Sequence, residues 1–322
     1  MSSGVVVRAG RGLYSVQTDT GRVVPCRLRG NLKKQFTYSE SSNHSRRRVE
    51  TAKKMRETDP LAVGDRVDIE VDDTGRAGVI ESIAPRTSSL ARRSGNERER
   101  QTLVANLDLA VVTFAMRDPQ VDLWKLDRFL VLAEDAGVTA LIVLNKAELA
   151  TQSEIETAAS DYRRIGYAVI ATSAKTGANV PALRDALAGK ISAFCGPSGV
   201  GKSSLLNALQ PGLRLKTAEV GEVTHLGRHT TVSAELIPLS FGGWLADTPG
   251  LRQIEFWDLP REDVAFCFPE MEPLMGDCRF ADCRHRGEPG CAVRAAVESG
   301  AISARRYESY LQMTKDVVRE AR

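Results

Sequence analysis

The stretch that decides the fold is Gly196-Pro197-Ser198-Gly199-Val200-Gly201-Lys202-Ser203, which is followed directly by Ser204. It satisfies the phosphate-loop pattern G-x-x-x-x-G-K-[ST] without a mismatch. Glycines at this spacing let consecutive backbone N–H groups form an anion nest, and a helix predicted from Ser204 directs its positive dipole end at the same phosphates. Lys202 would contact the β- and γ-phosphates, and the Ser203 hydroxyl would bind Mg²⁺. A chance glycine turn explains this spacing poorly.

Two segments after the loop carry residues of the kind that hold a metal and sense a phosphate. Asp247-Thr-Pro-Gly250 ends a short predicted strand, so Asp247 is predicted to hold Mg²⁺ and the Gly250 N–H to sense the γ-phosphate. Between them, Gly227-Arg-His-Thr-Thr231 is a polar stretch where a switch threonine would fall. The sequence does not choose between Thr230 and Thr231, and we assign Thr231 to Mg²⁺ together with Ser203 and Asp247.

Two segments before the loop resemble elements that read a guanine base. Asn145-Lys146-Ala147-Glu148 follows the predicted strand 140–144, and Ser173-Ala174-Lys175 follows the predicted strand 167–172. An Asn amide and an acidic side chain can read the base edge, and the second loop can offer a backbone N–H to guanine O6. The usual acid is Asp, whereas this chain has Glu148. The base-reading elements therefore precede the phosphate loop, a circularly permuted order.

Alternating strands and helices surround these motifs. Strands are expected at 109–115, 140–144, 167–172 and 191–195, and helices at 121–136, 154–166 and 181–188. This pattern predicts an α/β P-loop domain with a parallel sheet covered by helices on both faces.

The first 85 residues have a different pattern. Short Val- and Ile-rich segments at 5–7, 13–17, 23–28, 66–71 and 77–83 predict a small all-β barrel of about five strands. Residues 33–59 interrupt it as a long polar loop. From Arg22 to Arg56, eleven Lys/Arg face only two Glu, which indicates either an anionic partner or a solvated charged loop.

Near the C-terminus, Cys278, Cys283, His285 and Cys291 provide three thiolates and one imidazole, the ligand set of a closed structural zinc site. Cys26, Cys195 and Cys267 lie in apolar contexts and are interpreted as packing residues. The helical segment 292–322 fits either a docking helix or a helix packed on its own domain.

Composition limits the class of protein. The chain has 322 residues with 42% apolar and 26% charged residues, which is typical of a soluble protein of two or three domains. We see no membrane segment and no signal peptide, so we expect a cytoplasmic protein with reduced cysteines and no membrane partner.

The order of the motifs, together with Cys278-Arg-Phe-Ala-Asp-Cys-Arg-His-Arg-Gly-Glu-Pro-Gly-Cys291, resembles the RsgA (YjeQ) family of circularly permuted GTPases. The resemblance covers nearly the whole chain. It implies an OB-fold barrel at 1–85 that binds RNA, a permuted GTPase domain at 86–255 and a mainly α zinc-binding domain at 256–322.

The resemblance also implies a function. The protein would use GTP with Mg²⁺, carry one structural Zn²⁺, and bind the small (30S) ribosomal subunit and its 16S rRNA during late maturation, with hydrolysis stimulated by the subunit. We expect a monomer. Leu251 follows Gly250 where many GTPases have a water-orienting Gln, so His229 becomes the catalytic candidate. Two alternatives stay open: a P-loop ATPase or small-molecule kinase, and an RNA-binding module whose nucleotide site is only a sensor.

Overall fold

The structure is a computed structural model that describes residues 2–10, 12–30, 32, 56–57, 61–94, 99–213, 234–247, 259 and 262–316. The predicted site residues His229, Thr230, Thr231 and Gly250 lie outside these ranges, as does most of the basic stretch between 33 and 55.

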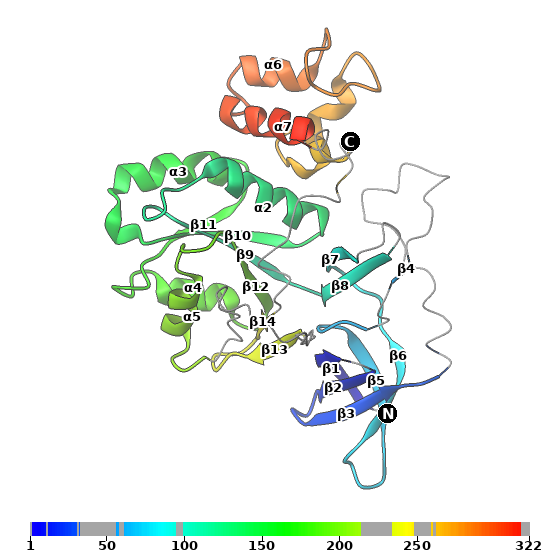
Figure 1. Ribbon diagram of the computed structural model, residues 1–322. Helices are drawn as coiled ribbons and strands as arrows, with labels where there is room; N and C mark the ends of the chain where they lie inside the picture. Colours follow the sequence, from blue (N-terminus) through cyan, green and yellow to red (C-terminus); the bar gives the residue numbers. More distant parts are fainter. Residues whose placement is uncertain are drawn as a thin grey trace, which may run out of the picture.

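An N-terminal barrel contains the five strands that the sequence predicts. They are β1 (Ser2–Gly10), β2 (Leu13–Thr18), β3 (Val23–Leu28), β5 (Arg66–Val71) and β6 (Gly78–Ile83). The strand order is β1-β2-β3-β6-β5, and β1 also pairs with β5, so the sheet closes on itself. Alternate side chains, among them Val6, Val16 and Ile80, are fully buried inside it. The OB-like barrel is thus confirmed (Figure 1).

A small sheet between the barrel and the next domain is absent from the sequence-based prediction. It has the order β4 (Arg56–Glu57), β8 (Glu99–Ala105) and β7 (Ser89–Ser94). Six of the nine residues at 92–100 are charged, and they hide the alternation that would indicate strands.

The central sheet has the order β11 (Ala168–Ala171), β10 (Thr139–Asn145), β9 (Leu109–Ala115), β12 (Ile191–Cys195), β14 (Trp244–Asp247) and β13 (Glu235–Pro238). The first five strands are parallel, and β13 is antiparallel to β14. Every residue of β9 is buried, as expected of a strand covered on both faces.

Helices cover both faces of this sheet (Figure 1). Helices α2 (Leu123–Asp135) and α3 (Gln152–Arg164) pack on the face that presents Val112 and Ile142. Helices α4 (Val180–Leu187) and α5 (Lys202–Leu209) pack on the face that presents Val111 and Val143. The alternation of Val111 with Val112 is that of a strand whose successive side chains enter two different cores. The predicted two-faced α/β arrangement is confirmed.

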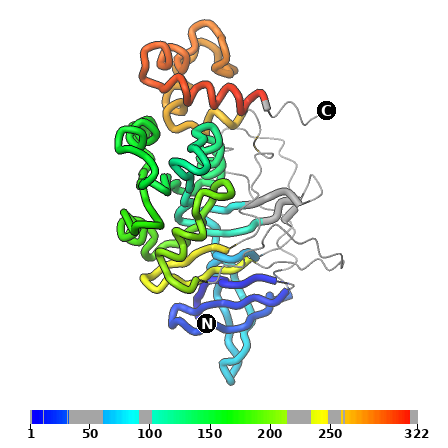
Figure 2. The backbone as a smooth tube through the Cα atoms, turned by 60° about the vertical axis from the view of Figure 1, so that its left-hand side comes forward, coloured from blue at the N-terminus to red at the C-terminus, as the bar shows by residue number. Residues whose placement is uncertain are grey.

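The barrel and the central sheet form one continuous hydrogen-bonded sheet. Strand β1 pairs with β13 in antiparallel fashion, with Arg8 opposite Glu235. In Figure 2 the blue barrel lies directly beside the yellow strands of the central sheet.

The described part of the C-terminal domain contains three short helices and one longer one: η4 (Val264–Cys267), η5 (Glu272–Asp277), α6 (Ala292–Glu298) and the 13-residue α7 (Ala304–Asp316). Helix α7 packs on its own domain, which is the second alternative predicted for this segment, and it also contacts α2. Arg306 of α7 is almost fully buried, and its guanidinium donates to Asp127 of α2 at 2.8 Å and to Glu270 at 2.8 Å. None of the helices in the described ranges combines the length and the hydropathy that a membrane span requires.

Candidate functional site

The predicted nucleotide-binding residues come together at one edge of the central sheet. Strands β10, β12 and β14 are parallel, so their carboxyl ends meet at the same edge. Asn145 ends β10, Gly196 follows β12, and Asp247 ends β14. Ligands of open α/β sheets bind in this position.

The phosphate loop has the backbone that its glycines predict. Gly196, Gly199 and Gly201 have φ angles of 133°, 79° and 91°. A Cβ at Gly196 would lie 2.1 Å from the carbonyl oxygen of Thr113 in β9, so no side chain fits there. The loop therefore runs close against the sheet before it turns into α5.

The ammonium of Lys202 lies across this loop. Its Nζ donates to the carbonyl oxygens of Gly196 at 2.7 Å and Pro197 at 2.6 Å. Ser203 and Ser204 follow in the first turn of α5, and both are exposed. The exposed Ser203 hydroxyl is thus accessible to a metal ion, which fits the predicted Mg²⁺ ligand.

Asn145 joins the base-reading loop to the phosphate loop. Its buried side chain donates from Nδ2 to the carbonyl oxygen of Val200 at 2.9 Å. Its Oδ1 accepts from the backbone N–H of Ala174 at 3.3 Å and from the hydroxyl of Thr172 at 3.3 Å. One amide thus holds three loops in register.

The neighbours of Asn145 differ in how far they are fixed. The Ala147 N–H donates to the carbonyl oxygen of Thr172 at 3.0 Å, and the Lys146 ammonium donates to the carbonyl oxygen of Asp118. Glu148 lies exposed in the short helix η2 (Ala147–Leu149) and has no hydrogen-bond partner among the described residues. Its carboxylate is therefore accessible to a ligand.

The second base-reading loop is closed by its own hydrogen bonds. Ser173 is buried, and its hydroxyl accepts from the Thr176 N–H at 3.0 Å. Lys175 is exposed at the tip. Because Ala174 is held by Asn145, this loop lies next to the base-reading strand end.

Asp247 is half-buried at the end of β14, one strand away from the phosphate loop. It stands directly opposite Glu235 of β13. The structure thus brings Asn145, Lys202, Ser203 and Asp247 to one edge, while their roles toward a nucleotide stay predictions.

The Cys/His cluster fits a tetrahedral metal site. The ligand atoms of Cys278, Cys283, His285 and Cys291 all lie within 4.8 Å of one another. The His285 Nδ1 is 3.5 Å from the Cys278 sulfur and 3.4 Å from the Cys291 sulfur. With Zn–S and Zn–N bonds of ordinary length, neighbouring ligand atoms would lie about 3.5–3.8 Å apart. Burial lowers the pKa of His285, which favours the neutral imidazole that binds a metal.

Residues that the sequence-based prediction missed hold this cluster in place. The Glu288 carboxylate accepts from the backbone N–H groups of Arg284 at 2.9 Å and Arg286 at 2.7 Å, on either side of His285. The hydroxyls of Tyr307 and Tyr310 donate to the carbonyl oxygens of His285 at 2.5 Å and Arg284 at 2.6 Å. An acidic residue inside a metal-binding loop is a signal that could have found Glu288.

The three remaining cysteines are buried in the structure, as expected of packing residues. Burial raises the pKa of Cys26 to about 11 and that of Cys195 to about 12, and Cys267 is also buried. Their thiols therefore stay protonated near neutral pH.

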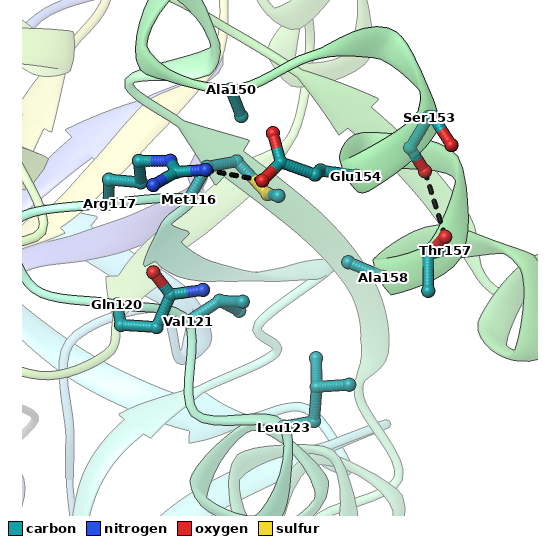
Figure 3. A pocket seen from close by; sticks show the side chains of 10 residues that line it. All are labelled: Met116, Arg117, Gln120, Val121, Leu123, Ala150, Ser153, Glu154, Thr157 and Ala158. Atoms are coloured by element: carbon teal, nitrogen blue, oxygen red, sulfur yellow. Dashed lines mark hydrogen bonds and ion pairs between the residues drawn. The ribbon is translucent and has the colours of Figure 1, made fainter.

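A pocket of about 270 Å³ lies between α2 and α3 (Figure 3). Its apolar lining includes Met116 and Val121, and the Arg117–Glu154 ion pair lies at its edge. None of the predicted nucleotide-binding residues lines this pocket, so it is separate from the nucleotide site.

Comparison with known proteins agrees with this geometry. The RsgA GTPase family model matches residues 83–257. The "Small ribosomal subunit biogenesis GTPase RsgA" of Gemmatimonas aurantiaca is 46% identical over 98% of this chain and 98% of its own length, and that of Moorella thermoacetica is 45% identical over 99% and 98%.

Solved structures show the same architecture. YjeQ from Thermotoga maritima superimposes with a TM-score of 0.78 at 32% identity and covers 99% of both chains. YloQ, described as a circularly permuted GTPase, has a TM-score of 0.72 at 30% identity and covers 98% of this chain and 95% of its own. With a phosphate loop that follows the base-reading strand at one sheet edge, the chain belongs to the RsgA GTPase family and is a GTP-hydrolysing enzyme of circularly permuted fold.

Proposed function

We propose that this GTPase binds the small (30S) ribosomal subunit and its 16S rRNA, assists late maturation of that subunit, and hydrolyses GTP faster when bound to it. The names of the relatives from Gemmatimonas aurantiaca and Moorella thermoacetica, small ribosomal subunit biogenesis GTPases, support the ribosomal partner. The observation that carries the proposal is the continuous sheet in which β1 of the barrel pairs with β13, next to the nucleotide edge. A factor of this kind works in the cytoplasm, and we propose that it acts as a monomer.

The barrel supplies a surface suited to RNA. Arg22, Arg27, Arg66 and Arg76 are exposed on it; the first two belong to the basic excess counted between Arg22 and Arg56, and the last two add to it. Cationic side chains on a barrel of this type contact the phosphate backbone. Binding should therefore weaken steeply as the salt concentration rises.

At the nucleotide edge, each predicted residue would have a separate role. Lys202 would bind the β- and γ-phosphates, and Asn145 with Glu148 would bind the base. Ser203, Thr231 and Asp247 would hold Mg²⁺, whose charge helps to neutralise the phosphates. The Gly250 N–H would sense the γ-phosphate, and His229 would orient the attacking water.

The Cys/His cluster would hold one structural Zn²⁺, because its donor set leaves no position for a substrate. Burial and the neighbouring thiols raise the pKa of the Cys283 thiol, so the three sulfurs need a cation to ionise together. Zinc is expected at one equivalent per chain by elemental analysis, and Cys278→Ser should lower it. A wild-type protein that folds fully without metal would contradict the assignment.

The central experiment measures GTP hydrolysis with and without purified small subunits, for the wild type and for His229→Ala. Wild-type turnover should rise with the subunit, while the variant should bind GTP equally well and lose the stimulated turnover. Equal stimulation of the wild type and His229→Ala would refute the role of His229, and no stimulation of the wild type would refute the ribosomal proposal.

A second candidate, hydrolysis of adenine nucleotides, is tested because Glu148 replaces the usual Asp. Each hydrogen bond that a carboxylate accepts from guanine contributes roughly 1.5–3 kcal/mol. Competition between GTP and ATP should favour GTP in the wild type, and Glu148→Ala should remove most of that preference. Equal affinity of the wild type for both nucleotides would support the second candidate.

A further inference from the structure

One row of charged residues crosses from the barrel into the nucleotide edge. Arg8 of β1 is opposite Glu235 of β13, and Glu235 is in turn opposite Asp247 of β14. Residues directly opposite in antiparallel strands project from the same face of the sheet, and their Cβ atoms lie about 4.5–5.5 Å apart. A barrel arginine, a glutamate and the predicted Mg²⁺ aspartate are therefore consecutive neighbours.

The first pair of this row is bonded directly. The Arg8 guanidinium donates from Nε to the Glu235 carboxylate at 2.6 Å, and its Nη2 contacts the same oxygen. The Glu235 side chain is 16% exposed and that of Arg8 is 63% exposed. Glu235 is thus held between strands, whereas Arg8 reaches it from the barrel surface.

The second pair brings together two carboxylates. Like charges directly opposite each other on a sheet repel, and the repulsion grows when one of them loses its counter-charge. Arg8 supplies a counter-charge to Glu235, so its position affects the electrostatic environment of Asp247. In sequence, Glu235 also comes four residues after Thr231.

We propose that Arg8 and Glu235 link the barrel to the hydrolysis site: Glu235 is a positioning residue for Asp247, and Arg8 fixes Glu235. A displacement of the barrel when it binds the small subunit changes the Arg8–Glu235 contact and so shifts Asp247. This inference rests on the proposed stimulation by the small subunit, and it identifies the route by which the barrel takes part.

The first test needs no ribosome. Hydrogen exchange of residues 2–10 is compared between the GDP form and the form with a non-hydrolysable GTP analogue. In the wild type the exchange of β1 should differ between the two forms, and in Arg8→Gln the difference should vanish. Arg8→Lys keeps the positive charge, so it should also keep the difference in exchange between the two forms. Equal exchange of β1 in the GDP form and the analogue form of the wild type would overturn the proposal. A difference in Arg8→Gln as large as that in the wild type would overturn it too.

The second test compares stimulated turnover at saturating small subunits with subunit affinity measured by sedimentation. Arg8→Gln should keep its subunit affinity, but its stimulation, the ratio of the subunit-stimulated rate to the basal rate, should fall roughly 5- to 150-fold, the range of a typical coupling energy. Glu235→Gln should lose stimulation similarly, and the double variant should be no worse than either single one, because both break one link.

A matched control is Arg163→Gln, which breaks another exposed arginine–glutamate pair, that with Glu156 on α3. It should leave stimulation intact. Additive losses in the double variant, or an equal loss in Arg163→Gln, would overturn the link. Absence of stimulation in the wild type would instead refute the proposed function, and the exchange experiment would still decide whether Arg8 couples β1 to the nucleotide.

Discussion

The side-chain amide of Asn145 donates to the carbonyl oxygen of Val200 at 2.9 Å, which ties the base-reading strand to the phosphate loop. The same side chain accepts from the Ala174 N–H. The predicted phosphate loop and the predicted base-reading loops are thus joined through one buried residue.

Asn145→Ala should therefore weaken binding of the whole nucleotide, not of the base alone. It leaves the Val200 carbonyl and the Ala174 N–H without their partner, at about 1–3 kcal/mol. That corresponds to roughly 5- to 150-fold weaker GTP binding in calorimetry. Asn179→Ala is the matched control, because within the described residues that exposed amide donates only to the Ala171 carbonyl oxygen. Equal affinities of the two variants would contradict the role of Asn145.

Gly196→Ala should damage the phosphate loop itself. The new Cβ would lie 2.1 Å from the Thr113 carbonyl oxygen, at a φ of 133° that only glycine adopts without strain. Backbone strain alone costs about 1–3 kcal/mol, and the clash adds to it. Melting temperature and GTP affinity should both fall. Gly189→Ala, at a φ of 72° with open space around it, should cost only about 1 kcal/mol and leave GTP binding unchanged.

Glu288→Gln should loosen the metal-binding loop. Burial raises the pKa of this carboxyl, but backbone N–H donors outweigh it and lower the pKa from 4.5 to about 2. The carboxylate therefore contributes stability that is complete above about pH 4.5 and is lost as the pH falls towards 2.

The variant should accordingly release zinc at a lower chelator concentration at neutral pH, and its stability should differ from that of the wild type less at pH 3 than at pH 7. Glu298→Gln, an exposed glutamate on α6, is the control. A pH-independent difference between Glu288→Gln and the wild type would count against this explanation.

Arg306→Met should detach the C-terminal domain from α2. It leaves the buried Asp127 and Glu270 carboxylates short of a counter-charge, and loss of one member of a buried pair costs about 3–5 kcal/mol. Trypsin should then cleave near α7 more rapidly, and the urea midpoint should fall. Arg294→Met breaks only an exposed pair with Glu298 and should cost at most about 1 kcal/mol. If the two variants were equally stable, the buried network would have no such role.

The phosphate loop and the Cys/His cluster could be predicted from the sequence because the residues that form each of them lie close together along the chain. Eight consecutive residues define the loop at Gly196, and the strand before it is a short apolar run, so geometry and chemistry can both be read from spacing. The four metal-binding residues lie within fourteen positions for the same reason.

Contacts between distant residues could not be predicted in this way. Arg306 and Asp127 are 179 positions apart, and nothing in a single sequence assigns one buried arginine to one aspartate. The small sheet around β7 was missed because charged residues mask its alternation, and the pairing of β1 with β13 leaves no local pattern. The predicted His229 lies outside the described residues, so its role depends on the kinetic test.

The pairing of Arg8 with Glu235 also bears on how the chain is made. The two residues are separated by 227 positions, so β1 emerges from the ribosome long before β13 exists. Strands β2, β3, β5 and β6 can complete the barrel early, whereas the edge of β1 near Arg8 stays open until translation passes β13. A chain that ends before residue 235 would leave this edge of β1 open to pairing with other strands. The edge is covered only when β13 has been synthesised and pairs with it.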